Sequence, residues 1–262
     1  MKWKTLLVET SNNVTILTLN QPEKINAMTM EMKNEFKEAV QLIKNDPDTR
    51  VLVLTGQGKS FSSGGDLQSA FDQFNAPPAK AKSDLVNYYK SFLSIRDLKI
   101  PTIAAIKGYA IGVGLCLALA CDIRVASTDL KISMPFIRLG LHPGMGTTHL
   151  LTRIIGTAKT LELCLTGDQI DAQEAFRIGI VNHLVEPENL NQFALSLAEK
   201  IARNPVIPAR FIKKSVYRGL NQDLESTLDY ESSAQVICST TEDMKEGLAA
   251  AREKRPPVFK GC

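Results

Sequence analysis

Three short apolar runs constrain the fold more than any other feature of the sequence. Residues 50–56 (RVLVLTG) form a continuous run rich in β-branched side chains, and 101–108 (PTIAAIKG) and 121–127 (CDIRVAS) predict strands of the same kind. Strands of this kind are typical of a parallel sheet, because both of its faces are covered. Helical spacing of apolar residues occurs elsewhere, as in 30–43. This alternation of strand and helix predicts an α/β fold with right-handed crossovers.

The two ends of the chain depart from this alternation. Near the N-terminus, LLVET and NVTILTLN flank Asn12-Asn13 and predict a β-hairpin. After about Asn204 no strand is predicted, and the sequence favours helical segments near 209–220, 222–237 and 241–253. We therefore expect a core over residues 1–203 and a helical C-terminal region over residues 204–262.

The composition excludes several classes of protein. Apolar residues make up 44% and charged residues 23% of the 262, as in ordinary globular proteins, and a net charge of +3 is too small to predict a nucleic-acid partner. No apolar run is long enough to span a membrane, and the first residues predict a strand rather than a signal peptide. Five scattered cysteines predict reduced thiols in the cytoplasm, and three histidines without paired spacing predict no metal site.

Two glycine-rich loops follow two of the predicted strands. Gly108, Gly112 and Gly114 lie in the first, and Gly64 and Gly65 lie in the second, FSSGGD. The spacing matches neither a dinucleotide fingerprint nor a phosphate-binding P-loop. Close packing of a helix on a strand would explain the glycines. Because loops after parallel strands lie at one edge of a sheet, each loop can also offer a backbone N–H to the same carbonyl oxygen, as in an oxyanion hole.

Five motifs that occur in order between residues 4 and 261 closely resemble the crotonase superfamily of enoyl-CoA hydratases and isomerases. They are FSSGGDL, PTIAAIKGYAIGVGLCLALACDIRVAS, SMPFIRLGLHPGMGTTHLLTRIIG, LTGDQIDAQEAFRIGIVNHLV and EGLAAAREKRPPVFKG. The resemblance implies a ββα spiral core with a C-terminal helical trimerisation region, assembled as a homotrimer or hexamer. It also implies an acyl-CoA or acyl-carrier thioester as substrate, a role in fatty acid metabolism, and no cofactor apart from the coenzyme A of the substrate.

The resemblance implies roles for particular residues. The N–H groups of Gly65 and Val113 would form an oxyanion hole for the thioester oxygen. Phe259 and Lys260 would contact coenzyme A from the same or a neighbouring subunit, and Asp66 would either contact substrate or fix its own loop. The full set of implied substrate-binding residues is Lys24, Ala27, Ser63, Gly64, Asp66, Leu67, Gly112, Phe259 and Lys260.

Both positions at which the resemblance implies a catalytic glutamate hold other residues. Cys116 follows the last glycine of the first loop by two residues, and Phe136 follows the proline of SMPF. A related isomerase group carries its base after the proline of the next loop, where this chain has Gly144. We expect Cys116 to be an inert buried thiol and Phe136 to fill the acyl pocket. His142 is the remaining candidate base, although a loop histidine bonded to backbone is the simpler interpretation.

Two functions therefore stay open. One is an enzyme that stabilises a thioester enolate during isomerisation, decarboxylation or an unorthodox hydration. The other is a relative without catalysis that sequesters acyl-CoA or assembles with active relatives. Tyr88, Tyr89 and Lys90 lie on the helix between the two loops and could line the acyl tunnel, although core or solvated roles are simpler. The sequence specifies neither the reaction nor the length of the acyl chain.

Overall fold

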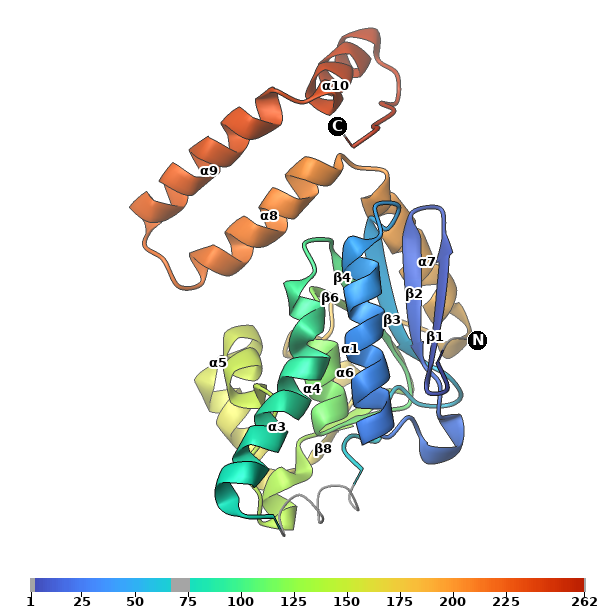
Figure 1. The fold of residues 1–262 in the computed structure, drawn as a ribbon, viewed down its shortest axis with the longest axis vertical. Coiled ribbons are helices and arrows are strands. Elements are labelled where there is room, and N and C mark those ends of the chain that lie inside the picture. The colour runs from blue at the N-terminus through green and yellow to red at the C-terminus, as the bar shows by residue number, and fades with distance from the viewer. Residues whose placement is uncertain (1–2, 67–75, 262) are drawn as a thin grey trace.

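The main sheet holds six strands within the described residues, 3–66 and 76–261 of a computed structural model (Figure 1). Their order is β1-β2-β3-β4-β6-β9. The first pair is antiparallel, and the other neighbours are parallel. The bounds are β1 Leu6–Ser11, β2 Val14–Leu19, β3 Val51–Gly56, β4 Thr102–Ile106, β6 Ile123–Ser127 and β9 His183–Val185.

The hairpin predicted around Asn12 and Asn13 is confirmed. Ser11 pairs with Val14, so the turn contains only these two asparagines. Their φ angles are 51° and 62°, in the left-handed region that a tight turn between twisted strands requires. Asparagine adopts this region more readily than most residues, which explains the pair at this position.

Helices cover both faces of the sheet because successive strand side chains point to opposite faces. In β3, Leu52 and Leu54 belong to one apolar core, and Val51 and Val53 belong to another on the opposite face. All four are at most 4% exposed. The first core is shared with α1 (Met30–Asn45), α3 (Pro78–Leu93) and α4 (Val113–Leu119), and the second with α7 (Leu190–Ala202). The predicted parallel sheet, buried on both faces, is thus confirmed.

A second, smaller sheet lies beside the first. Its order is β5-β7-β8, with β5 parallel and β8 antiparallel to the central strand. These strands and the remaining elements of the core are β5 Tyr109–Ile111, β7 Lys131–Ser133, β8 Gln169–Asp171, α5 Thr147–Thr166, α6 Ala172–Arg177 and the 3-10 helices η1 Pro22–Lys24, η2 Ser94–Asp97, η3 Pro135–Leu139 and η4 Pro187–Asn189.

Three C-terminal helices form an arm that projects from the core (Figure 1). They are α8 (Val206–Gly219), α9 (Leu224–Ser239) and α10 (Glu242–Glu253), and each lies within three residues of its predicted bounds. No strand occurs in the described residues after position 203, as predicted. Within the described ranges, no helix is both long enough and apolar enough to cross a bilayer. The division into two domains at residue 204 stays a prediction.

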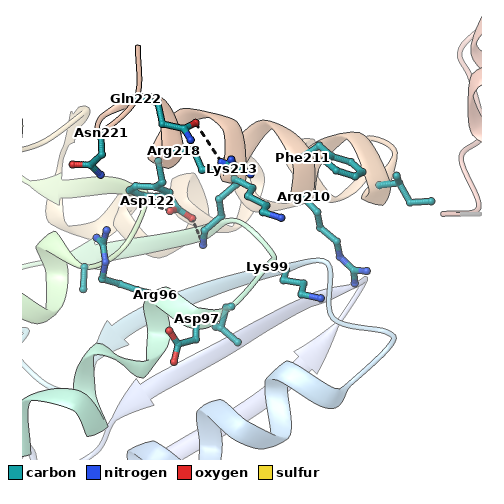
Figure 2. Close-up of a pocket in the computed structure, with 15 residues that line it drawn as sticks. Arg96, Asp97, Lys99, Asp122, Arg210, Phe211, Lys213, Arg218, Asn221 and Gln222 are labelled. Atoms are coloured by element: carbon teal, nitrogen blue, oxygen red, sulfur yellow. Dashed lines mark hydrogen bonds and ion pairs between the residues drawn. The ribbon is translucent and has the colours of Figure 1, made fainter. Parts of the chain in front are cut away.

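Asp122 attaches the arm to the core. One carboxylate oxygen accepts hydrogen bonds from the Thr102 backbone N–H at 2.7 Å and the Thr102 hydroxyl at 2.9 Å. Lys213 of α8 lies 2.8 Å from the same oxygen, and the Tyr217 hydroxyl donates to the other oxygen at 2.7 Å. Figure 2 shows Lys213 reaching down from α8 to Asp122. The Lys213 and Asp122 side chains are only 11% and 17% exposed, so this ion pair is shielded from solvent.

Asp122→Ala should lower the free energy of unfolding by about 3 kcal/mol, because it leaves a shielded ammonium without its counter-charge and the Tyr217 hydroxyl without its acceptor. Urea denaturation at one protein concentration measures the change. Asp84→Ala is the matched control, since Asp84 forms an exposed ion pair with Lys80 on α3. That pair should contribute about 0.5 kcal/mol or less. Equal effects of the two substitutions would contradict the anchoring role of Asp122.

Candidate active site

Segments that follow four parallel strands meet at one edge of the main sheet. They are residues 20–28 after β2, 57–66 after β3, 107–113 after β4 and 128–136 after β6. Backbone hydrogen bonds connect neighbouring segments, as between Ser63 N–H and the Ile25 carbonyl at 2.8 Å and between Gly112 N–H and the Ser133 carbonyl at 2.9 Å. Open α/β sheets bind ligands at this edge. The two glycine-rich loops therefore lie together, as their positions after parallel strands predict.

A parallel β-bridge between Ser62 and Ala110 joins the two glycine-rich loops. Ser62 N–H donates to the Tyr109 carbonyl oxygen at 2.9 Å, and Ile111 N–H donates to the Ser62 carbonyl oxygen at 3.1 Å. The Ser62 hydroxyl is buried and accepts a hydrogen bond from Gly64 N–H at 3.1 Å. The relative position of the loops is thus fixed mainly by backbone groups.

Two of the glycines are required by the close approach of these loops. A β-carbon on Gly64 would lie 2.6 Å from the Ile111 carbonyl oxygen, and the φ angle of Gly64 is +97°. A β-carbon on Gly114 would lie 2.8 Å from the Ser62 β-carbon. Both distances are shorter than van der Waals contact allows. Close packing therefore explains both glycines, although Gly114 of α4 packs against the other glycine loop and not against a strand of the main sheet.

The same packing brings together the backbone amides of Gly65 and Val113. Neither N–H donates a hydrogen bond to an acceptor in the described residues. Val113 is the first residue of α4, where helix geometry leaves the N–H unpaired. A β-carbon on Gly65 would lie 3.6 Å from Val113 Cγ2, and one on Gly64 would lie 3.8 Å from the Val113 nitrogen. Two donors in adjacent loops can bind one oxygen atom.

The segment from Lys24 to Met28 lies against the second glycine loop. Ser63 Oγ donates to the Lys24 carbonyl oxygen at 3.4 Å, and Met28 N–H donates to the Gly64 carbonyl oxygen at 2.8 Å. Ala27 lies within this segment. The residues implied in coenzyme A binding on these two segments are therefore neighbours of the Gly65 and Val113 amides, which we call the amide pair.

Within one chain, Phe259 and Lys260 lie at the ends of the strands opposite to those that carry the amide pair. Arg50, which directly precedes β3, donates to the Lys260 carbonyl oxygen at 3.3 Å, whereas Gly65 follows the other end of that strand. Within one chain these two residues therefore do not join the amide pair.

Leu67, also implied in substrate binding, lies outside the described residues. Burial is the main reason that the pKa of Tyr88 is raised, and the smaller causes are Tyr89 and then the Asp66 carboxylate.

Cys116 lies one turn into α4, fully buried. Its sulfur is 2.7 Å from the Thr147 hydroxyl oxygen, and that hydroxyl donates to the Gly144 carbonyl oxygen at 2.6 Å. Burial raises the pKa of Cys116 to about 12, and the contact with Thr147 opposes this shift. The residue is therefore a neutral thiol at pH 7, and a neutral thiol does not deprotonate water or attack a thioester.

Phe136 places an aromatic ring beside the amide pair. Its Cζ atom would lie 3.5 Å from a β-carbon on Gly112, the residue directly before Val113. The ring is half-buried and packs against the main core. This position fits the predicted role of Phe136 as an apolar wall of the acyl pocket.

Tyr89 fills the space that a side chain at position 144 would occupy. A β-carbon on Gly144 would lie 2.3 Å from the Tyr89 hydroxyl oxygen. Burial is the main reason that the pKa of Tyr89 is raised, and Cys116 is the second. Sequence reasoning placed this residue only on a helix that could line the acyl tunnel. In the sequence, the glycine at position 144 could have indicated that another side chain lies close to this position. It does not indicate that this side chain is Tyr89.

His142 does not contact the amide pair. Its side chain is exposed, and Nδ1 lies 2.7 Å from the Pro143 carbonyl oxygen, which agrees with the simpler interpretation of a histidine bonded to backbone. In the described residues, no group of three or more His, Cys, Asp and Glu side chains could hold a metal ion.

A cavity of about 870 Å³ lies at the other edge of the sheet, between α8 and the segments that precede β4 and β6 (Figure 2). Six of its lining side chains are cationic: Arg96, Lys99, Arg210, Lys213, Lys214 and Arg218. The amide pair follows the opposite ends of the strands, so this cavity is separate from the candidate active site.

Taken together, the fold and the loops define an α/β protein with two adjacent backbone donors at the carboxyl edge of a parallel sheet. The family model for enoyl-CoA hydratase/isomerase matches residues 9–262. The chain belongs to this family, a part of the crotonase superfamily.

Individual relatives match over nearly the full chain. A probable enoyl-CoA hydratase from Mycobacterium bovis is 37% identical, and a crotonyl-CoA hydratase from Syntrophomonas wolfei is 35% identical, each covering 99% of both chains. Among solved structures, an enoyl-CoA hydratase subunit from Geobacillus kaustophilus is 34% identical with a TM-score of 0.93 and covers 100% of both chains. An enoyl-CoA hydratase from Bacillus anthracis is 33% identical with the same TM-score, covering 99% of this chain and 100% of its own.

Cys116 should resist alkylation in the folded protein. A pKa of about 12 leaves roughly one thiol in ten thousand ionised at pH 8, and the sulfur is also inaccessible. Peptide mapping by mass spectrometry after iodoacetamide treatment measures the rate at this residue. The same treatment in urea is the control and should modify Cys116 at least a hundred-fold faster. Similar rates in the two conditions would show that the thiol is accessible and ionised.

Proposed function

We propose that the protein binds an acyl thioester of coenzyme A and stabilises its enolate through the N–H groups of Gly65 and Val113. The observation that carries this proposal is the pair of adjacent amides without acceptors in the described residues. Donors fixed in advance near the oxygen that gains negative charge typically lower the barrier by about 3 kcal/mol each. The family relationship supports the ligand, since several relatives are named for hydration of coenzyme A thioesters.

Hydration of a simple enoyl thioester should be slow at this site. Adding water across the double bond needs one group to deprotonate water and another to protonate the α carbon. The resemblance implies glutamates for these tasks, but their positions hold Cys116 and Phe136. The first is a buried neutral thiol, and the second is a phenyl ring. The amide pair alone would polarise the thioester without transferring a proton.

With crotonyl-CoA, turnover should be at least about a thousand-fold below that of a hydratase with both carboxylates. Loss of the enoyl-thioester absorbance measures the rate, and the crotonyl-CoA hydratase of Syntrophomonas wolfei serves as reference. A combined Cys116→Glu and Phe136→Glu variant should recover part of the rate if it folds. A wild-type rate near the reference that is abolished by His142→Ala but not by Cys116→Ala would contradict this proposal and identify the base.

Val113→Pro should weaken binding of a thioester enolate mimic on the order of ten-fold or more. Proline removes the N–H, yet it is tolerated at the first position of a helix, so α4 can still form. Val113→Ala is the matched control, because it shortens the side chain and keeps the amide. Calorimetry measures both affinities. Equal affinities for the two variants would remove Val113 from the oxyanion hole.

We also propose that the arm packs against another copy of the chain in a trimer or hexamer. Its helices expose large apolar side chains that the chain itself does not cover. They include Ile212, Val216, Leu224, Leu228 and Val236, which are 56–73% exposed. Apolar surface of this extent is typical of subunit interfaces. Such packing could also bring Phe259 and Lys260 of one copy to the amide pair of another.

Light scattering at micromolar concentration should therefore report a trimer or a hexamer. Replacing both Leu224 and Leu228 with glutamate should shift the mass toward that of one chain, because charges would then lie on the proposed interface. Monomeric wild-type protein would contradict the proposed assembly.

A further inference from the structure

The cavity between α8 and the core has a large excess of positive charge. Its volume of about 870 Å³ lies within the usual range for pockets that bind small molecules. Six cationic and two acidic side chains line it, and the acids are Asp97 and Asp122. The lining side chains therefore carry a net charge of +4 at pH 7. A hollow with one predominant sign of charge concentrates ligands of the opposite sign.

Five of the six cations form no ion pair with a carboxylate in the described residues. Lys213 is the exception, since its ammonium lies 2.8 Å from Asp122. The side chains of Lys99 and Arg210 also form no hydrogen bond or ring contact within the described ranges. Repulsion among these like charges opposes folding unless an anion lies between them. The cavity therefore has cationic groups that are available to a ligand.

These cations reach the cavity from two sides. Arg96 lies in η2 and Lys99 lies between η2 and β4, whereas Arg210 lies in α8. In the view of Figure 2, Arg210 extends down from α8, and Lys99 extends from the core on the same side of the cavity. The Asp97 carboxylate points away from α8 in this view. An anion with several charged oxygen atoms can therefore contact the core and the arm together.

The cavity and the proposed subunit interface lie on opposite faces of α8. The lining residues of this helix recur every three or four positions and so share one face. Ile212 and Val216, which are 63% and 62% exposed, lie about half a turn away from that face. Packing of these two residues against another copy does not itself cover the cavity. A ligand site here is therefore compatible with the proposed trimer or hexamer.

We propose that this cavity binds a small molecule with two or more linked phosphate groups, such as a nucleotide or an inorganic polyphosphate. Linked phosphates offset a net charge of +4, which a single carboxylate does not. The planar guanidinium groups of Arg96 and Arg210 suit paired hydrogen bonds to phosphate oxygens. The ligand would bridge the core and α8 and so hold the arm in the position that Asp122 anchors. The site does not involve the amide pair.

Calorimetry with sodium tripolyphosphate and the full-length protein, in low salt with a chelator, tests the proposal. One ligand should bind per chain, and its affinity should fall as salt is added. Lys99→Gln combined with Arg210→Gln should weaken binding about ten-fold or more, because two contacts between cation and phosphate are lost. Without ligand, the variant should unfold at the wild-type temperature, since neither side chain has a partner in the described residues. Tripolyphosphate should raise the unfolding temperature of wild type, because it binds only the folded protein.

Lys37→Gln combined with Lys82→Gln is the matched control. These exposed lysines of α1 and α3 do not line the cavity and have no partner in the part of the chain that the structure describes. The control removes the same charge as the cavity variant and should keep the wild-type affinity. Equal losses of affinity in the two double variants would reveal unspecific attraction and would overturn the proposal.

ATP without magnesium distinguishes the two sources of linked phosphates. Affinity equal to that of tripolyphosphate would assign recognition to the phosphates alone, and tighter binding would assign part of it to the nucleoside. Both results support the proposal, provided that the cavity variant weakens binding of each ligand. Absence of binding of either ligand at about 1 mM would overturn it.

Two further results would also overturn the proposal. Lys24 is implied in coenzyme A binding, so loss of tripolyphosphate binding in Lys24→Gln but not in the cavity variant would place the anion at the thioester site. Light scattering could instead show that the cavity variant dissociates while its control stays assembled. The cavity would then belong to an interface between copies of the chain and not to a small-molecule site.

Discussion

The candidate site depends on one backbone contact, the β-bridge between Ser62 and Ala110 that joins the loops after β3 and β4. The loops approach so closely that side chains at Gly64 or Gly114 would overlap the opposite loop. This contact sets the positions of the Gly65 and Val113 amides relative to each other. Because main-chain groups make the contact, the pair of donors does not depend on any catalytic side chain. Side chains around the site can therefore change while its pair of backbone donors is preserved.

The side chains around the amides determine which reactions this backbone geometry could support. Carboxylates at positions 116 and 136 could act as general acid and base in proton transfer to and from water. This chain instead has a buried thiol at position 116 and a phenyl ring at position 136. Gly144 leaves a space that Tyr89 enters from α3. The edge with the two amides thus has an apolar ring beside it and two backbone donors, but no carboxylate at position 116 or 136. Such a site suits hydration poorly, because neither the thiol nor the phenyl ring can deprotonate water.

Much of the architecture could be predicted from sequence because it follows from local patterns. The apolar run at residues 50–56 indicated a strand buried on both faces, and Asn12-Asn13 indicated a tight turn; the structure confirms both. The meeting of the two glycine loops followed from parallel strand order. The Tyr89 position did not, because it depends on how α3 crosses the loop at Gly144, a contact between residues 55 positions apart. The separation of Phe259 and Lys260 from the amide pair likewise depends on the path of the arm.

The backbone amides of Gly65 and Val113 are proposed to hold one thioester oxygen. Infrared difference spectroscopy of a bound, unreactive acyl-CoA with a 13C-labelled thioester carbonyl tests it most directly, because hydrogen bonds to the oxygen weaken the C=O bond. The carbonyl stretch should move to lower frequency when the thioester binds to wild type. The shift should be smaller in Val113→Pro and unchanged in Val113→Ala. A bound carbonyl at its free-solution frequency, or one that Val113→Pro leaves unaltered, would rule out the oxyanion hole.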